Sequence, residues 1–258
     1  MNVNTTNTTA KKRILALALA LILLLLALTR VTLSYFTDTK KATNTFTYGS
    51  VSIKQYENTT LIDNGQGLSY PNFLPIATTS SDISAIRSDP NYRQKSVSVE
   101  LDANSSDAYI RTFIRVPAEV MDASHPILHL DIVDGHNGWT KVEYTYTDAT
   151  DNTQYKVISF TQPVALSNTG SDSNKKQTPF FGVYLDAKAN VIDGYLYHVD
   201  DSGTRHPTAS TVSASDPLKI DVVTQAVQAD GFASAEMAFN AAFSNKDPWD
   251  NTVSTPNP

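Results

Sequence analysis

The sequence predicts an all-β protein: a jelly-roll-like β-sandwich with one short C-terminal helix, preceded by a cleaved signal peptide. The chain of 258 residues contains no cysteine, so a hydrophobic core and not disulfide bonds must hold the fold together. Threonine, serine, asparagine and aspartate are abundant and charged residues make up only 18%, a composition that favours strands and polar turns. Apolar and polar residues alternate in several short runs between such turns, which is the pattern of half-buried strands.

The first 34 residues have the three parts of a secretory signal peptide. A basic start, Lys11 to Arg13, is followed by fifteen uninterrupted apolar residues, Ile14 to Leu28. This run is shorter than the roughly 20 residues that span a bilayer. Thr32 and Ser34 then supply the small residues at −3 and −1 from a cleavage between Ser34 and Tyr35.

Two other interpretations of this segment are weaker. An uncleaved membrane anchor is the alternative, because Val31 to Leu33 could extend the apolar run. An internal core helix is disfavoured because the run has no polar face.

The chain divides on this basis into a signal peptide (1–34), an N-terminal segment (35–45), one β-sandwich domain (46–245) and a flexible C-terminal tail (246–258). Without the first 34 residues it holds 16 basic and 26 acidic residues, a net charge of −10. Such a chain repels nucleic-acid phosphates and anionic lipid, so we expect no nucleic-acid partner and no membrane contact after cleavage.

The strands follow from alternation and from turn dipeptides. Val51, Ile53 and Gln55 share one face, and Asp134–Gly135 and Asn137–Gly138 mark turns. In the first half of the chain we expect a strand over 46–57, a long loop with short ordered pieces over 58–95, and two strands joined by a hairpin-type turn at 102–107. A strand–turn–strand unit over 125–148 and a strand over 154–166 follow. After a polar loop over 167–177 we expect two strands around 186–190 and a last strand over 217–228.

One helix is expected near the C-terminus, within residues 229–243. Ser234 is a suitable N-cap, and Glu236 lies in the first turn, where the helix dipole favours a carboxylate. Phe239 and Phe243 are four residues apart and therefore lie on the same side of the helix.

Three blocks of the sequence resemble the TasA/camelysin family of Gram-positive matrix-fibre proteins, which carry a SipW-dependent signal peptide. The first block, "YFTDTKKATNTFTYGSVSIKQYE" (35–57), has the family pattern of an aromatic-Phe-x-Asp start, Asn-x-Phe, a glycine and alternating apolar residues that end in glutamate. The second is "KSVSVELDANSSDAYIRTFIRVP" (95–117), and the third is "IDVVTQAVQADGFASAEMAFNAAF" (220–243). Residues from about 117 to 215 match only in general β character.

The resemblance implies a secreted jelly-roll subunit, located in the extracellular matrix or at the cell surface, that polymerises head to tail into biofilm fibres. Its implied partners are other copies of itself and a dedicated signal peptidase, and an accessory matrix-assembly protein if assembly is not spontaneous. In such fibres the freed N-terminal segment completes the sheet of the next subunit. The donor residues that the resemblance implies are Tyr35, Phe36, Thr37, Asp38, Thr39, Lys40, Lys41, Ala42, Thr43, Asn44 and Thr45.

The residues of this segment are suited to such a role independently of the family. The segment 35–45 is rich in threonine and contains neither proline nor glycine, so it can extend and add to an open sheet edge. A head-to-tail contact of this kind does not close on itself and therefore gives filaments. The alternative is a terminus that is disordered or pairs with its own chain.

The sequence indicates no catalytic, cofactor-binding or metal-binding residues. His125 and His129 have the spacing of the zincin HExxH motif, but Pro126 replaces the glutamate, and in a strand the two would be about 13 Å apart. Cysteine nucleophiles are excluded, and neither a GxSxG elbow nor a phosphate-binding glycine loop is present.

Several groups have an ordinary structural explanation beside a functional one. The acidic loops at 131–137, 148–151 and 200–201 offer calcium ligands but lack EF-hand spacing, so Asx-turns are favoured. His136, His198 and His206 adjoin turn residues and are expected to be solvated. Trp139 and Trp249 could line a glycan-binding face, although aromatic residues in strands more often belong to the core.

Three hypotheses therefore compete: a fibre-forming matrix subunit, which we favour, a camelysin-type cell-surface metalloprotease, and a monomeric adhesin or glycan-binding sandwich.

Overall fold

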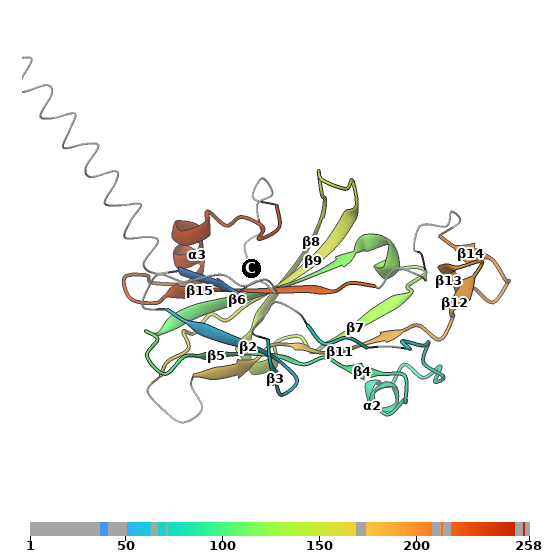
Figure 1. The fold of residues 1–258 in the computed structure, drawn as a ribbon, viewed down its shortest axis with the longest axis horizontal. Helices are drawn as coiled ribbons and strands as arrows, with labels where there is room; N and C mark the ends of the chain where they lie inside the picture. Colours follow the sequence, from blue (N-terminus) through green and yellow to red (C-terminus); the bar gives the residue numbers. More distant parts are fainter. Residues whose placement is uncertain are drawn as a thin grey trace, which may run out of the picture.

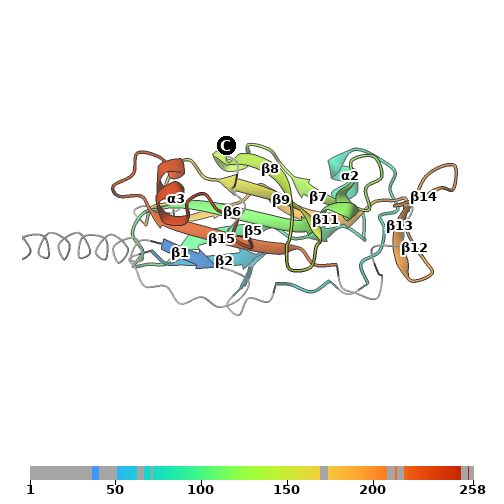
Figure 2. The ribbon, with the colours of Figure 1, turned by 90° about the horizontal axis from the view of Figure 1, so that it is seen from above.

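The computed structural model describes residues 37–40, 51–62, 67–70, 72–168, 174–207, 213, 218–250 and 255. These residues form four sheets in which every pairing between strands is antiparallel (Figures 1 and 2), which confirms the all-β fold class. The predicted signal peptide (1–34) lies outside the described residues. Within them, no helix has the length and apolar character needed to cross a membrane.

The order of the strands within each sheet differs from their order in the chain. The five-stranded sheet contains, from edge to edge, β1 (Thr37–Lys40), β15 (Asp221–Gln228), β6 (Ala108–Pro117), β9 (Gln154–Thr161) and β8 (Thr140–Thr147). The four-stranded sheet contains β10 (Lys175–Gln177), β5 (Val97–Leu101), β2 (Ile53–Glu57) and β3 (Thr60–Leu61). The two three-stranded sheets contain β4 (Arg93–Gln94), β11 (Phe180–Leu185) and β7 (Leu128–Ile132), and β12 (Ala189–Ile192), β13 (Tyr195–Val199) and β14 (Arg205–His206).

Short helices connect or cover these sheets. They are the α-helices α2 (Ile83–Arg87) and α3 (Ala235–Phe243) and the 3₁₀ helices η1 (Ala118–Met121) and η2 (His136–Gly138).

The main core lies between the five-stranded sheet on one side and the sheets of β5 and β11 on the other. One apolar cluster joins residues of all three sheets, among them Ile53, Val99, Ile114, Phe160 and Phe180. In Figure 1, β15 and β6 run along the molecule, with β2 and β5 beneath one end and β11 and β4 beneath the other. The sheet of β12, β13 and β14 lies at the far end in both ribbon views.

The predicted hairpin at 102–107 is wrong, because its two strands, β5 and β6, lie in different sheets. The predicted strand–turn–strand unit over 125–148 is present as β7, η2 and β8, and its two strands also lie in different sheets. The link 102–107 is long enough to cross the roughly 10 Å between packed sheets. It is held at its start, where Asp102 forms an ion pair of 2.8 Å with Lys54 and accepts a hydrogen bond from the Ser52 hydroxyl.

The region 178–203 contains three strands, β11, β12 and β13, and not the two that we expected. The extra strand is made by the tight turn Asp193–Gly194, where both residues have positive φ angles (53° and 81°). This is the backbone requirement of a two-residue hairpin, and an Asp-Gly pair meets it at low cost.

The predicted C-terminal helix is confirmed as α3. The Ser234 side chain caps it by accepting a hydrogen bond of 3.3 Å from the Met237 amide, and the Phe239 and Phe243 rings stack at 6.3 Å. The buried side chains of α3 pack on Val227 of β15. In the segment that we predicted to be a tail, Asp247 and Thr255 are buried.

Candidate functional site

The described part of the predicted donor segment is β1, which lies at the edge of the five-stranded sheet. It pairs with β15 in a defined register, in which Thr37 is opposite Val227 and Lys40 is opposite Thr224. Ser34, Tyr35 and Phe36, and the donor residues from Lys41 to Thr45, are outside the described part of the chain. The structure therefore identifies β15 as a strand with which this segment can pair.

β1 covers only half of β15. β15 has eight residues, and β6 pairs with all of them on one side. On the other side β1 pairs with Thr224 to Val227. On that side no strand among the described residues pairs with Asp221 to Val223, which continue the edge next to β1 and are called the open half of β15 below.

Both faces of β15 are buried, so the edge of β15 with which β1 pairs lies between packed layers. On the inner face, Thr224 is fully buried, donates a hydrogen bond of 2.8 Å to the Gln55 side chain of β2, and lies 3.1 Å from the Thr112 hydroxyl of β6. On the outer face, Val227 packs against α3. This burial on two faces fixes the register of a paired strand more firmly than an exposed edge would.

A buried arginine holds α3 and the C-terminal segment in place on the outer face of the sheet. Arg111 of β6 lies between the rings of Phe113 and Phe239, with its guanidinium carbon 4.8 Å and 4.5 Å from their centroids. It donates hydrogen bonds to Gln225 of β15 (2.9 Å) and to Thr255 (3.3 Å). Burial lowers the pKa of Arg111 to about 10, so the guanidinium remains charged at neutral pH.

The C-terminal segment is fixed by a second buried contact next to this arginine. The Tyr144 hydroxyl of β8 donates a hydrogen bond of 2.5 Å to the Asp247 carboxylate. Burial, together with this bond, raises the pKa of Tyr144 far above its ordinary value. Trp249 packs edge-on against Phe113, so its ring is part of this packing and not of an exposed aromatic surface. Trp139 is likewise buried, and its indole donates to the Gln177 carbonyl.

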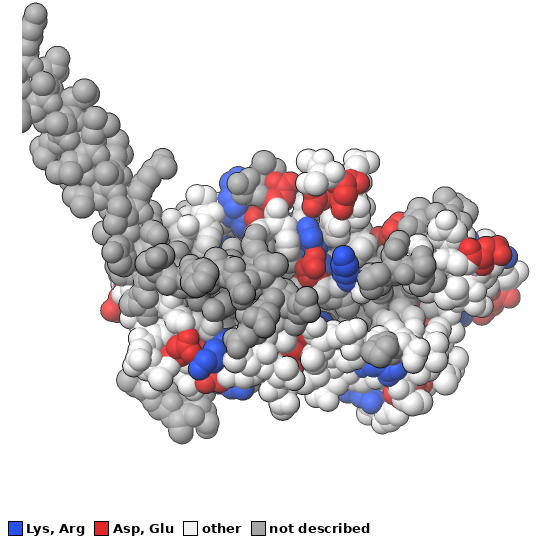
Figure 3. Space-filling model, viewed as in Figure 1, with Lys and Arg blue, Asp and Glu red and all other residues white. Residues whose placement is uncertain are grey.

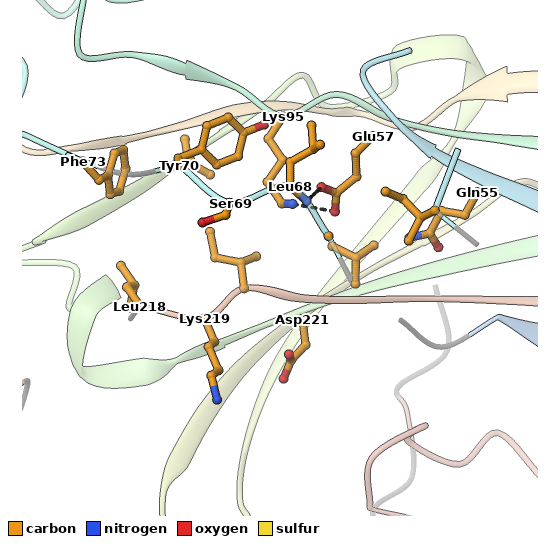
Figure 4. Close-up of a pocket in the computed structure, with 15 residues that line it drawn as sticks. Gln55, Glu57, Leu68, Ser69, Tyr70, Phe73, Lys95, Leu218, Lys219 and Asp221 are labelled. Atoms are coloured by element: carbon orange, nitrogen blue, oxygen red, sulfur yellow. Dashed lines mark hydrogen bonds and ion pairs between the residues drawn. The ribbon is translucent and has the colours of Figure 1, made fainter. Parts of the chain in front are cut away.

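A cavity of about 380 Å³ adjoins the open half of β15. It lies between β2 and the start of β15 and includes Leu218, Ile220 and Val222 among its lining residues. At one wall the Lys95 ammonium and the Glu57 carboxylate meet at 2.5 Å (Figure 4), and both side chains are almost completely buried. The Glu57 carboxylate also accepts a hydrogen bond of 2.8 Å from the Leu68 amide.

In the structure, the two zincin-spaced histidines make different direct contacts. The Nε2 atom of His129 on β7 lies 2.7 Å from the Asp186 carboxylate, whereas His125 in the preceding loop stacks on His206. His198 is buried, so the expectation that it is solvated is wrong. Its partners come from distant parts of the sequence, which is why spacing alone contains no signal for it.

The acidic loops have structural partners in several cases. Asp131 is buried and is bonded by Arg87 of α2 (2.7 Å) and by the Tyr92 hydroxyl (2.7 Å). Asp134 pairs with Lys141, and Asp148 with Arg115. On the face drawn in Figure 3, blue and red atoms are interspersed over the described residues.

No family model matches the sequence, and the comparisons with curated proteins and with solved structures give no match either. The assignment of a function therefore depends on the residues and geometry described above.

Proposed function

We propose that this protein is a secreted structural subunit that polymerises into extracellular matrix fibres, as the resemblance to the TasA/camelysin family implies. The observation that carries the proposal is the pairing of β1 with β15. The segment that the sequence predicts to be a donor strand occupies a sheet edge whose neighbouring strand is buried on both faces. In the fibre, β1 of one subunit takes this place on β15 of the next.

The exchange requires no new type of contact. The pairing that β1 makes within its own chain can be repeated between two copies, which is the principle of domain swapping. Ten residues, 41–50, separate β1 from the start of the next described segment at Val51. A stretch of ten residues spans up to about 33 Å when extended, enough for β1 to leave its own chain and reach a neighbour.

The open half of β15 gives the exchanged strand room to lengthen. Continuing the register beyond Lys40 and Thr224 would place Lys41, Ala42 and Thr43 of the incoming subunit opposite Val223, Val222 and Asp221. Ala42 would then reach β15 beside the cavity lined by Val222. These backbone hydrogen bonds would add to the affinity of the incoming strand for β15.

The proposal is tested by negative-stain electron microscopy of two purified chains, one starting at Tyr35 and the other at Phe46. We expect fibres from the first and monomers from the second, because only the first carries β1. Monomers from both would favour an adhesin or a subunit that needs an assembly partner. Fibres from both would place the polymerisation contact elsewhere on the surface.

Assembly is also expected to depend on pH. The chain from Tyr35 carries a net charge of −10, and protonation of carboxylates toward pH 5 reduces repulsion between subunits. We therefore expect a higher fibre yield at pH 5 than at pH 8, measured by sedimentation of equal amounts of protein. A yield that is flat or rises from pH 5 to pH 8 would contradict this expectation.

Two carboxyl groups should keep their contribution to the stability of the fold at the lower pH of that comparison. Hydrogen bonds from the backbone amides of His125 and Ser124 lower the pKa of Asp122, and bonds led by the Ser202 hydroxyl lower that of Asp200. A carboxyl whose pKa is lowered by folding stabilises the fold above its unfolded value of about 4 and loses this contribution as the pH falls through the folded pKa. At pH 5 the stabilising contribution of both groups is therefore retained.

A further inference from the structure

Four of the five histidines in the sequence gather where the sheet of β12, β13 and β14 meets the loop that precedes β7. The imidazole of His125 in that loop stacks on the imidazole of His206 in β14, with ring centroids 3.5 Å apart and planes 6° apart. His198 of β13 meets His125 edge-on at 5.5 Å. Histidines from separate parts of the chain thus share one location, which the donor-strand proposal does not use.

A carboxylate completes a group of possible metal ligands. The Nε2 atom of His206 lies 3.2 Å from Oδ2 of Asp200. His125, Asp200 and His206 each offer one ligand atom, and these three atoms lie within 4.8 Å of one another. Their side chains are 34%, 30% and 23% exposed, so an ion can reach them from solvent.

Asp200 is held so that one oxygen faces the histidines. Its Oδ1 atom accepts hydrogen bonds from the Ser202 amide and hydroxyl (2.9 Å and 2.6 Å) and from the Thr204 amide (2.9 Å). These bonds fix the carboxylate in the turn between β13 and β14. They leave Oδ2 directed to His206.

His198 positions the loop that carries His125. It is buried, and its Nδ1 atom lies 2.8 Å from the carbonyl oxygen of Pro126. Because a carbonyl oxygen can only accept, Nδ1 must carry the proton of this bond. The bond ties the residue after His125 to β13, the strand that leads into the Asp200 turn.

We propose that His125, Asp200 and His206 bind one zinc ion. Zinc takes imidazole nitrogen and carboxylate oxygen at about 2.0–2.2 Å in tetrahedral geometry, so neighbouring ligand atoms lie about 3.3–3.5 Å apart. The separation of 3.2 Å between His206 and Asp200 is close to that edge. His125 joins them by tilting out of its stack on His206. Two imidazoles with one carboxylate favour zinc over calcium or magnesium, which prefer oxygen ligands alone.

The ion would fasten the small sheet to the rest of the sandwich. His206 and Asp200 belong to the β13–β14 hairpin, whereas His125 belongs to the loop between η1 and β7. An ion bound by both parts stabilises the arrangement in which they touch, because the unfolded chain does not hold the ligands together. This inference is independent of the donor strand, since none of its residues lies on β1 or β15.

The test is a titration of zinc into metal-free protein from Tyr35 onward, which contains every described residue, below the concentration at which fibres appear. Isothermal titration calorimetry should give one zinc ion per chain. His206→Ala and Asp200→Asn should each weaken the affinity by about tenfold or more, the size of effect seen even for residues that only support a metal ligand. Asparagine keeps an oxygen for the Ser202 and Thr204 amides, so the turn is preserved.

His136→Ala is the matched control, because His136 is the one histidine outside the cluster and packs on Phe181. It should bind zinc as the parent does. Absence of zinc binding by the parent, or equal affinity in the parent and in His206→Ala and Asp200→Asn, would overturn the proposal. Hydrogen exchange gives a second readout. Zinc should slow exchange across β13 and β14 in the parent and in His136→Ala, and unchanged exchange in zinc-bound parent protein would overturn the fastening role.

Discussion

Thr37→Cys combined with Val227→Cys should convert the fibres into a ladder of disulfide-linked multimers on non-reducing gels. These positions are opposite each other in the β1–β15 register. Cross-strand partners have Cβ atoms about 4.5–5.5 Å apart, close enough for a disulfide to form with a small adjustment. The chain has no native cysteine, so every disulfide must join introduced cysteines. If β1 pairs with the next subunit, each disulfide joins two chains and the ladder follows.

The same variant distinguishes pairing between chains from pairing within one chain. Pairing within the chain closes a disulfide inside each monomer, and the gel shows monomers only. A variant with Thr37→Cys alone should give at most dimers. Thr37→Cys with Ala108→Cys is the control for random oxidation, because position 108 is buried on β6, on the far side of β15 from β1. A ladder from this control would show that disulfide formation does not report the register.

The balance between the two pairings explains why the open half of β15 matters. Only ten residues, 41–50, connect β1 to the next described segment of its own chain, and a short connection gives an effective concentration in the millimolar range. Pairing with another chain must therefore gain contacts beyond those of β1 with its own β15. The backbone of Asp221 to Val223, which no described strand pairs with on the side of β1, and the adjoining cavity are the described features next to that pairing.

Local patterns in the sequence predicted individual strands and the helix better than they predicted which strands pair with each other. The β2 alternation and the α3 cap depend on neighbouring residues, and both are present in the structure. The partners of β5 and β6 depend on which sheet each strand joins. A link of six residues, five of them polar, can either turn back or cross the core. Turn composition therefore predicted a boundary at 102–107 but not the crossover.

The candidate site was predictable only in part for the same reason. An extended, edge-forming N-terminal segment follows from the threonine-rich composition of residues 35–45, and β1 is a strand at a sheet edge. That its neighbour is β15, nearly two hundred residues later, has no local signal. The contact between His125 and His206 is hidden in the same way, because the two residues meet only after the β12–β14 sheet has packed against the loop before β7.

Lys95→Met should destabilise the fold by about 3–5 kcal/mol, because it leaves the Glu57 carboxylate buried without its counter-charge. The two side chains are only 7% and 4% exposed, and their charged atoms are 2.5 Å apart. The measurement is the free energy of unfolding in urea under conditions in which the protein is monomeric. Adding Glu57→Gln should recover much of the loss, since glutamine removes the charge and keeps an oxygen for the Leu68 amide.

Lys188→Met is the matched control for this substitution. Lys188 forms an ion pair of 2.9 Å with Asp201, but those side chains are 42% and 90% exposed. Exposed pairs contribute about 0–1 kcal/mol, so this variant should unfold close to the parent. A similar small effect for Lys95→Met would show that water reaches Glu57 through the cavity. The cavity wall next to β15 would then be hydrated. Burial of this wall would no longer support a fixed register for the incoming strand.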